Sequence, residues 1–483
     1  MDIRNMIGRI LSLALVCILS FALFGCASLA PPTREPAAQV AATEAPKPSA
    51  EPEEAQTGQE EAEQAFVPDK ELTMSIVGLG YSDAAVEEAM AKEEGLAPMD
   101  AYCIANREKA EVAYPGVPWT WNDWGEGFAR EQTQRAAIAA GTPPTNIASE
   151  TLIQAYIDAN MLQEVPGDVL EGINPSFIAT GADGKPYAVA IKASLFVLYY
   201  NKTILGEYTG DSERPPATWE QWRSVASLIT SSSTDEETGV TAAWGGCIPS
   251  FPHEGGTLRA TPFLRQLGVD FGGNGQIRLN DPAVRQALQY IGDMNAYLLP
   301  GLSTSIDEAP LWDAFSAKGK QRIAFLVGNM RQMPDLLAGE MNLGVSTLPI
   351  PEGGQRANCL TDAVFIGVPV GIPKEEADLF WAFFRTICLE EAQLQHFVED
   401  YHVVPVQSML DNAALFSGND KAAVRVAIAD LNAGVYSGQA AFIQNNDRIW
   451  EILGRKVLHG IARKGSVEAL CDEAQPQIEG LLR

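Results

Sequence analysis

Residues 187–202 read Tyr187-Ala-Val-Ala-Ile-Lys-Ala-Ser-Leu-Phe-Val-Leu-Tyr-Tyr-Asn-Lys202 and decide the fold of this chain. The stretch follows a turn sequence, Gly181-Ala-Asp-Gly-Lys-Pro186, and is rich in β-branched, aromatic and aliphatic residues, which favour strand. It is longer than one ordinary strand of about five or six residues, and Lys192 and Ser194 interrupt it midway. We therefore predict two strands end to end, the first completing one sheet and the second beginning another. A passage between two sheets predicts a hinge with a cleft beside it.

Length and composition point to a soluble globular body with more than one core. A chain of 483 residues exceeds what a single hydrophobic core holds, so two domains are expected. Hydrophobic residues make up 46% of the chain, as in ordinary globular proteins. The net charge of −28 argues against nucleic acid as a partner, because phosphate binding depends on Lys and Arg. It also argues, more weakly, against a strongly anionic ligand.

The first residues form a targeting segment. Arg4 and Arg9 make a positive region, and residues 10–24 are an apolar run too short for a transmembrane helix. The sequence Leu23-Phe24-Gly25-Cys26 resembles a bacterial lipoprotein signal, which implies a signal peptide over residues 1–25 and lipidation of Cys26. The alternative is an ordinary secretory signal in which Cys26 is incidental. Residues 26–70 are rich in Ala, Pro, Glu, Gln and Thr, which predicts a disordered tether.

The cysteines of the body indicate neither disulfides nor a metal site. Their number is odd, their spacing is wide and no Cys-x-x-Cys pair occurs, so buried free thiols are expected. We predict no metal and no cofactor. These cysteines are Cys103, Cys247, Cys359, Cys388 and Cys471.

The body alternates between strand and helix patterns. Strand patterns over residues 71–77, 119–124 and 145–148 are separated by helical patterns, which predicts an α/β fold with mainly parallel sheets. In such sheets the ligand lies beyond the carboxyl ends of the strands. Further along, Thr218 and Gln221 form a capping-box pattern, and Asp281-Pro282 predicts a helix start. Residues 240–246 and 322–327 read as strands, the second ending in a turn at Gly328.

The order of these pieces resembles the family 1 extracellular solute-binding proteins, the lipoproteins of sugar-type ABC importers, related in layout to maltodextrin-binding proteins. The resemblance covers residues 71–483 and is distributed over many weak motifs. They are Ala139-Ala-Gly-Thr-Pro-Pro-Thr-Asn-Ile147, Tyr199-Tyr-Asn-Lys202, Pro216-Ala-Thr-Trp-Glu-Gln-Trp222, Asn280-Asp-Pro-Ala-Val284, Ala314-Phe to Gly328-Asn, Gly344-Val-Ser-Thr-Leu-Pro-Ile-Pro351 and Glu375-Glu-Ala-Asp-Leu-Phe-Trp381.

The resemblance implies a type II periplasmic-binding-protein-like fold of two α/β lobes. Each lobe would be a mixed, mostly parallel sheet flanked by helices, with the ligand cleft between the lobes. We expect one lobe over residues 71–190 and 351–400 and the other over 191–350 and 401–483, with crossings near Ile191, Pro349 and Tyr401. The family is not enzymatic. Its members, expected to be monomers at the extracytoplasmic face, close around a small-molecule solute and present it to ABC permease subunits.

Two departures keep the identity of the ligand open. Asn329-Met330 stands where the family commonly has an aromatic residue after the glycine, and Ala148-Ser149-Glu150 replaces an aromatic of the maltodextrin branch. Sugars are held by aromatic faces and by planar polar groups that satisfy their hydroxyls. Candidate ligand residues therefore lie at strand ends and crossings. They are Trp121, Trp124, Glu150, Thr151, Lys192, Ser194, Trp244, Trp312, Asn329, Arg331, Thr361 and Asp362.

Each candidate has a structural alternative. Trp244 and Trp312 fit core packing as well as ligand contact, and Glu150 fits a helix cap. Lys192 within an apolar run favours a cleft position, against snorkelling at the surface of the hinge.

Two other functions are open to this sequence. The acidic balance, with Glu150 and Asp362, allows the same fold to bind a polyamine, a peptide or another cationic solute. An anchored hydrolase is the weaker alternative, because the chain has four histidines, no Gly-x-Ser-x-Gly elbow and no His-Glu-x-x-His motif. We predict a carbohydrate-binding protein and not an enzyme.

Overall fold

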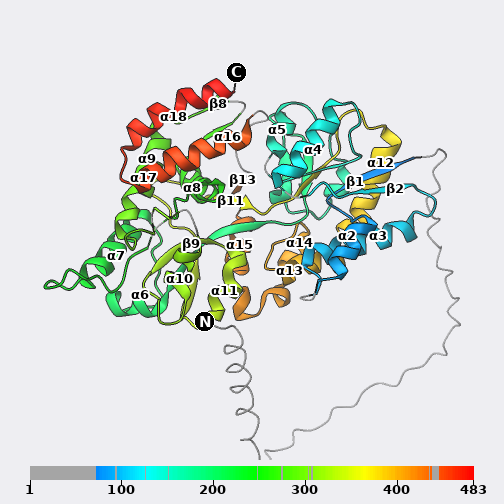
Figure 1. Cartoon of the computed structure of the whole chain (residues 1–483). Coiled ribbons are helices and arrows are strands. Elements are labelled where there is room, and N and C mark those ends of the chain that lie inside the picture. Colours follow the sequence, from blue (N-terminus) through cyan, green and yellow to red (C-terminus); the bar gives the residue numbers. More distant parts are fainter. Residues whose placement is uncertain are drawn as a thin grey trace, which may run out of the picture. The chain divides into compact units, whose positions relative to one another are not determined.

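The computed structural model describes residues 72–482, except 93–94, 126, 151, 247, 274–275, 303, 306–307, 434–435 and 438–444 (Figure 1). The chain divides into two units between Glu63 and Gln64, and every described residue lies in the second. The expected signal peptide, Cys26 and the tether lie outside the described residues, as does Thr151. In the described part, no helix is both long and apolar enough to cross a membrane.

The deciding stretch forms two strands in different sheets, as predicted. Strand β5 (Pro186–Ala190) pairs with β4 (Ile178–Thr180) and β12 (Phe365–Gly367). Strand β6 (Ser194–Asn201) pairs with β9 (Phe325–Asn329), β10 (Leu343–Ser346) and β11 (Asn358–Thr361). Every residue of β6 is buried, which is why the run is apolar throughout.

The first sheet has the order β3-β12-β5-β4, where β3 is Ile147–Ser149. Strands β1 (Met74–Val77) and β2 (Trp119–Asn122) form a separate parallel pair. The buried side chain of Asn146 joins this pair to the sheet, because it accepts from the backbone N–H of Val77 at 3.1 Å and donates to its carbonyl at 2.9 Å. These two hydrogen bonds replace the backbone pairing that a neighbouring strand would give to Val77.

Helices cover both parts of the structure (Figure 1). With the first sheet lie α2 (Asp83–Met90), α3 (Pro98–Ala113), α4 (Gly127–Ala139), α5 (Ile153–Asp158), α12 (Lys374–Phe383) and α13 (Glu391–Glu399). Next in the chain after β6 come α6 (Lys202–Thr209), α7 (Trp219–Ser232), α8 (Glu254–Gln266), α9 (Pro282–Met294), α10 (Ala309–Ser316) and α11 (Met333–Ala338). The last are α14 (Gln407–Asp411), α15 (Ala422–Asn432), α16 (Asn446–Glu451), α17 (His459–Ala462) and α18 (Val467–Leu481).

The predicted helix starts are confirmed. The side chain of Thr218 accepts from the backbone N–H of Gln221 at 3.1 Å, and Asp281 caps α9 ahead of Pro282. The reciprocal bond of the capping box differs slightly, because the side chain of Gln221 accepts from Ala217 rather than from the cap residue. Local side-chain chemistry fixes these positions without help from the core.

The pairing directions differ from the expected mostly parallel arrangement. Among the described strand pairings, β1–β2 and β11 with β13 (Tyr436–Ser437) are parallel, and the others are antiparallel. Strand β11 precedes a passage between the sheets, and β12 follows it. Strand β11 is antiparallel to β6, and β12 is antiparallel to β5. Residues 240–246, predicted as a strand, form only isolated bridges.

Three segments pass between the sheets, and they lie side by side. They are residues 191–193, residues 362–364 and the connector 400–406 that follows α13. The N–H of Ile191 donates to the carbonyl of Val364 at 3.0 Å, and Ala193 and Val403 exchange two backbone hydrogen bonds of 2.9 Å. The middle passage, residues 362–364, comes later than the crossing expected near Pro349. After the turn at Pro351–Gly354 the chain first forms β11, which pairs with β6 in the second sheet, and only then passes to the first sheet.

The core has two clusters that meet on β6. Leu195, Val197 and Tyr199 belong to a cluster that also contains the first sheet, α3 and α12. Their even-numbered neighbours face a second cluster built on α7, α8, α9 and α18. Because side chains alternate along a strand, β6 belongs to both cores at once.

Candidate functional site

The joint between the sheets gathers many of the predicted residues. Ser194 begins β6, Asn329 ends β9, and Thr361 and Asp362 follow one another at the end of β11. The Ser194 hydroxyl donates to Oδ1 of Asn329, and Nδ2 of Asn329 donates to Asp362 at 2.9 Å and to Thr361 at 3.4 Å. The amide of Asn329 therefore ties together three strands that are distant in the sequence.

A second layer of charges covers this amide. Arg331 contacts Oδ2 of Asp362 at 3.8 Å and Oδ2 of Asp400 at 3.2 Å. Their side chains are 42%, 38% and 28% exposed, in the same order, so they remain accessible to a solute. A guanidinium between two carboxylates offers hydrogen-bond donors and acceptors side by side, which suits vicinal hydroxyls.

Lys192 lies within electrostatic range of these charged groups and contacts His402, which is fully buried. The Lys192 ammonium is 3.3 Å from Nε2 of His402 and 5.5 Å from the ring centre of Phe397. Burial lowers the pKa of Lys192, against the opposing charge of Asp362. Burial lowers the pKa of His402 to about 4, although its contact with Asp400 acts the other way. Burial thus shifts the pKa of both groups downward, and for His402 the shift leaves the ring neutral at pH 7.

Asp400 and His402 were missed by the sequence prediction. Nδ1 of His402 lies 3.3 Å from Oδ2 of Asp400. Burial alone would raise the pKa of Asp400, but His402 and the charge of Arg331 bring it below its ordinary value. The available signal was the expected crossing near Tyr401, between the two, read in the same way as the crossing that singled out Lys192.

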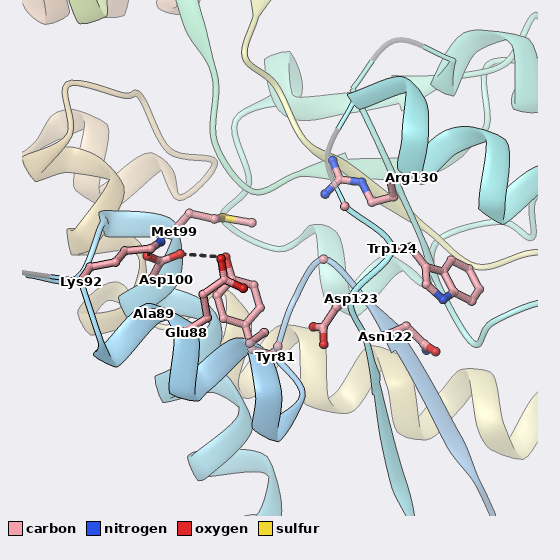
Figure 2. A pocket seen from close by; sticks show the side chains of 14 residues that line it. Tyr81, Glu88, Ala89, Lys92, Met99, Asp100, Asn122, Asp123, Trp124 and Arg130 are labelled. Carbon is pink, nitrogen blue, oxygen red and sulfur yellow. Dashed lines mark hydrogen bonds and ion pairs between the residues drawn. The ribbon is translucent and has the colours of Figure 1, made fainter.

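The carboxyl ends of β1 and β2 border a cavity of about 250 Å³ (Figure 2). Trp124 lies on one side of it, and Tyr81, Glu88 and Asp100 lie across from it. The hydroxyl of Tyr81 donates to Asp100 at 2.9 Å, and Lys92 makes an ion pair with the same carboxylate at 2.6 Å. Trp124 is thus the predicted tryptophan that lines an open space.

Glu150 follows β3 and makes an ion pair with Arg130, which also lines the cavity and is only 4% exposed. The backbone N–H of Glu150 donates to the carboxylate of the buried Glu131 at 3.0 Å, which fixes the turn. Its charge raises the pKa of Lys192, so the cavity side and the joint lie within electrostatic range. Glu150 is therefore the predicted residue that connects the cavity side with Lys192 electrostatically.

The remaining predicted tryptophans lie elsewhere. Trp121 is in the core, stacked on Trp119 with ring centres 5.2 Å apart and packed against Phe383. Trp244 is not at the end of a strand as expected; it forms a single bridge with Ile323, and its indole N–H is buried.

Trp312 lies over the backbone of Gly328 at the end of β9. A Cβ added to Gly328 would be 2.6 Å from Cη2 of Trp312, so the glycine makes room for the indole. The indole N–H donates to Glu308 at 3.4 Å, and Arg259 holds that carboxylate with two hydrogen bonds of 3.0 and 2.8 Å. Because Gly328 precedes Asn329, this partly buried tryptophan lies next to the joint. No pattern in the sequence indicated that Glu308 and Arg259 would support this tryptophan.

Metal and thiol chemistry receive no support from the described residues. In this part of the chain, no three His, Cys, Asp or Glu side chains are grouped to hold a metal ion. The described cysteines, Cys103, Cys359, Cys388 and Cys471, are buried free thiols as predicted. Cys247 lies outside the described residues.

Comparison with known proteins agrees with this architecture. The family model described as bacterial extracellular solute-binding protein matches residues 92–394. No curated protein matches the chain.

Solved structures show the same fold at low sequence identity. The cyclic α-maltosyl-1,6-maltose binding protein from Arthrobacter globiformis has a TM-score of 0.62 and 19% identity, over 86% of this chain and 99% of that one. The sugar-binding protein MalE from Xanthomonas citri has a TM-score of 0.62 and 16% identity, over 85% and 97%. UgpB from Mycobacterium tuberculosis in complex with glycerophosphocholine has a TM-score of 0.56 and 16% identity, over 83% and 97%. The chain thus has the two-lobe α/β fold of type II binding proteins, which confirms the fold class expected from the sequence.

Proposed function

Because the chain belongs to the bacterial extracellular solute-binding protein family, we propose that it captures a carbohydrate, either a mono- or an oligosaccharide, and delivers it to an ABC importer. The family consists of extracytoplasmic binding proteins of ABC transporters, not of enzymes. The carbohydrate and the particular permease are our proposal. The site would lie at the joint between the sheets, in a cleft bordered by both.

The observation that carries the proposal is the cluster around Asn329. Its amide donates to the carboxylate of Asp362 at 2.9 Å, and the guanidinium of Arg331 lies 3.8 Å from the same carboxylate; all three groups are planar and partly exposed. Hydroxyl groups need both donors and acceptors when they leave water. Trp124 lines the cavity of Figure 2 and Trp312 lies against Gly328, so these two are the candidates for an aromatic contact with the sugar.

The structural comparisons support the same cargo class. Two of the three similar proteins are named for binding sugars, one as a maltosyl-maltose binding protein and one as a sugar-binding protein. At this identity they support a class of cargo, while the side chains of the present chain decide its identity.

A titration with purified protein tests the proposal. Isothermal titration calorimetry with mono-, di- and trisaccharides should find at least one ligand that binds with a Kd of about 1 μM or below, which corresponds to about −8 kcal/mol. Asn329→Ala should weaken that ligand about tenfold or more, because partners of the amide lose their hydrogen bonds. The matched control is Asn295→Ala, which removes an amide bonded only to the carbonyl of Ile291 in α9. Equal affinities in the two variants would remove the joint from the site.

A cationic solute is the second candidate. The cavity of Figure 2 combines Trp124 with the carboxylates of Glu88, Asp100 and Asp123, a set that suits a positive charge beside an aromatic face. The structural relative in complex with glycerophosphocholine supports this class. Affinity for a choline or polyamine probe that falls steeply with salt, with no response to any sugar, would decide for it.

The lipid anchor is proposed on sequence alone. Cys26 follows Leu23, Phe24 and Gly25 in the lipoprotein pattern, and residues 27–70 would act as the tether. Expression in a bacterial host with radiolabelled palmitate should label the chain in the membrane fraction. Cys26→Ser should abolish the label, and a label that persists in the variant would exclude this attachment site.

A further inference from the structure

The segments that link the two sheets meet around one buried histidine. We propose that His402 is a positioning residue that holds Lys192 and Asp400 in place while its imidazole is neutral, and that its protonation in acid weakens cargo binding. The inference rests on the proposed function, because it assumes that these linking segments move when cargo is captured.

His402 contacts the first segment directly, and its partner Asp400 is joined to the remaining segment through Arg331. Its Nε2 lies 3.3 Å from Nζ of Lys192 on the first segment, and Nδ1 lies 3.3 Å from Oδ2 of Asp400 on its own connector. Arg331 reaches from Asp400 to Asp362 on the remaining segment. These side-chain contacts lie beside the paired backbones of Ala193 and Val403.

The contact with Lys192 determines which nitrogen carries the proton. An ammonium group can only donate, so Nε2 of His402 must offer its lone pair, and the ring proton then resides on Nδ1, facing Asp400. A second proton would be added at Nε2. It would place an N–H donor and a positive charge directly against the Lys192 ammonium, with the ring itself fully buried.

The surrounding groups decide whether the His402 ring is neutral or protonated at a given pH. Lys192 and Arg331 oppose the protonated ring, and Asp400 favours it. The helix packed on the ring contributes Phe397, which is uncharged. Lys421 and Asp420 lie around the neighbouring Tyr401. With burial included, the pKa of His402 is about 4, so the ring is neutral at pH 7 and the linked segments are held together.

The backbone of two segments is strained beside this contact. Asp362 and Tyr401 have backbone φ angles of 51° and 60°, which residues other than glycine rarely adopt. Such conformations persist only where the surroundings impose them. Separation of Lys192 from His402 removes one of these constraints, so the segments are placed to rearrange when the contact breaks.

The experiment compares cargo affinity across pH in four proteins. They are the unmodified protein, His402→Gln, His402→Leu and the control His396→Gln, which changes a partly exposed histidine of the adjacent helix. Glutamine can accept from Lys192 and donate to Asp400 but cannot be protonated. We expect the affinity of the unmodified protein and of the control to fall about twofold from pH 7 to pH 4, where half of the His402 rings carry the second proton. His402→Gln should keep the neutral-pH affinity and lose this fall, and His402→Leu should bind weakly at both pH values.

A measurement without cargo separates this inference from the proposed function. Spin labels at Val112→Cys on α3 and Val240→Cys after α7 occupy positions that are 81% and 63% exposed. Their distance distribution should change below pH 5 in the protein with His402 and stay constant with His402→Gln. If it changes equally in both, or in neither, the inference is wrong whatever the cargo is. If the change depends on His402 but no sugar binds in the calorimetric titrations, the inference stands and the carbohydrate proposal is wrong.

Discussion

A charged residue inside an apolar run marked the joint of this protein. Lys192 was singled out because a lysine rarely interrupts a buried strand, and the structure places it between β5 and β6. Its ammonium contacts His402, 210 residues later in the chain. The type of residue was therefore informative, but its partner could not be read from the sequence.

Gly328 is a second position at which one residue matters. A methyl group there would lie 2.6 Å from Trp312, 2.7 Å from the Gln332 side chain and 2.9 Å from Tyr199. Gly328→Ala should therefore destabilise the protein by about 1–3 kcal/mol through overpacking and displace the indole. Urea denaturation followed by circular dichroism measures the first effect, and cargo affinity the second.

The control for this change is Gly480→Ala in α18, where an added Cβ meets nothing within 4 Å. That variant should be neutral or stabilised by about 0.5–1 kcal/mol, since alanine favours helix over glycine. If Gly328→Ala is as stable as this control and binds cargo normally, Trp312 has room to adjust and is not a fixed wall.

At the scale of elements, β6 and β1 show two ways of joining a sheet. Strand β6 has strand partners on both edges, with the side chain of Asn358 bonded to the backbone of Phe196, and is buried on both faces. Strand β1 has a strand partner on one edge, β2, and depends on the side chain of Asn146 on the other. Asn146→Ala should cost about 3 kcal/mol, because it leaves the buried N–H and carbonyl of Val77 without partners. Amide hydrogen exchange should show β1 opening before β6.

The exposed Gln289 of α9 provides the comparison for Asn146. Its side chain bonds only to Asp293 one turn away, so Gln289→Ala should change stability by less than about 0.5 kcal/mol. A loss for Asn146→Ala no larger than this would mean that β1 is held by its apolar contacts alone.

A helix start gives a smaller effect. Thr218 caps α7 through its bond to the N–H of Gln221, and Thr218→Ala should lower the free energy of unfolding by about 1 kcal/mol. Thr218→Ser retains the hydroxyl and should recover most of this loss in the same urea titration. No difference between the two variants would assign the helix start to the packing of Trp219 instead.

At the scale of the molecule, the linkage between the sheets predicts acid sensitivity. The pKa of His402 falls from its ordinary value of 6.5 to about 4 on folding, so the unfolded chain binds more protons between these values. Stability from this group is complete above pH 6.5 and is lost as the pH falls towards 4. Urea midpoints at pH 7, 5 and 4 should show a smaller loss for His402→Gln than for the unmodified protein.

Carboxylates also titrate between pH 7 and 4, so the contribution of His402 is the difference in urea midpoint between the unmodified protein and His402→Gln at each pH. His396→Gln should follow the unmodified protein at every pH, since the change does not touch the joint. Parallel losses in all three proteins would assign the acid sensitivity to carboxylates alone.

The fold was predictable from the sequence to a large extent. Local pattern predicts the two consecutive strands at 187–202, the helix starts at Thr218 and Asp281, and the α/β class. It does not predict the strand directions or the later middle crossing, because a strand pattern says nothing about which neighbour a strand pairs with. The site was predictable in part: Trp124 borders a cavity, while Trp121 has the same apparent position in the sequence but lies in the core.

The sequence by itself determined where strands and helices begin, that the chain must change sheets near Lys192, and which polar residues interrupt the apolar runs. These properties depend on neighbours a few residues apart, whose propensities and alternation act locally. Only the tertiary structure decided that Ser194 would meet Asn329, and that His402 would lie between Lys192 and Asp400. Such contacts form because three passages between sheets pack together, and their proximity is set by the burial of whole strands, which no local stretch of sequence encodes.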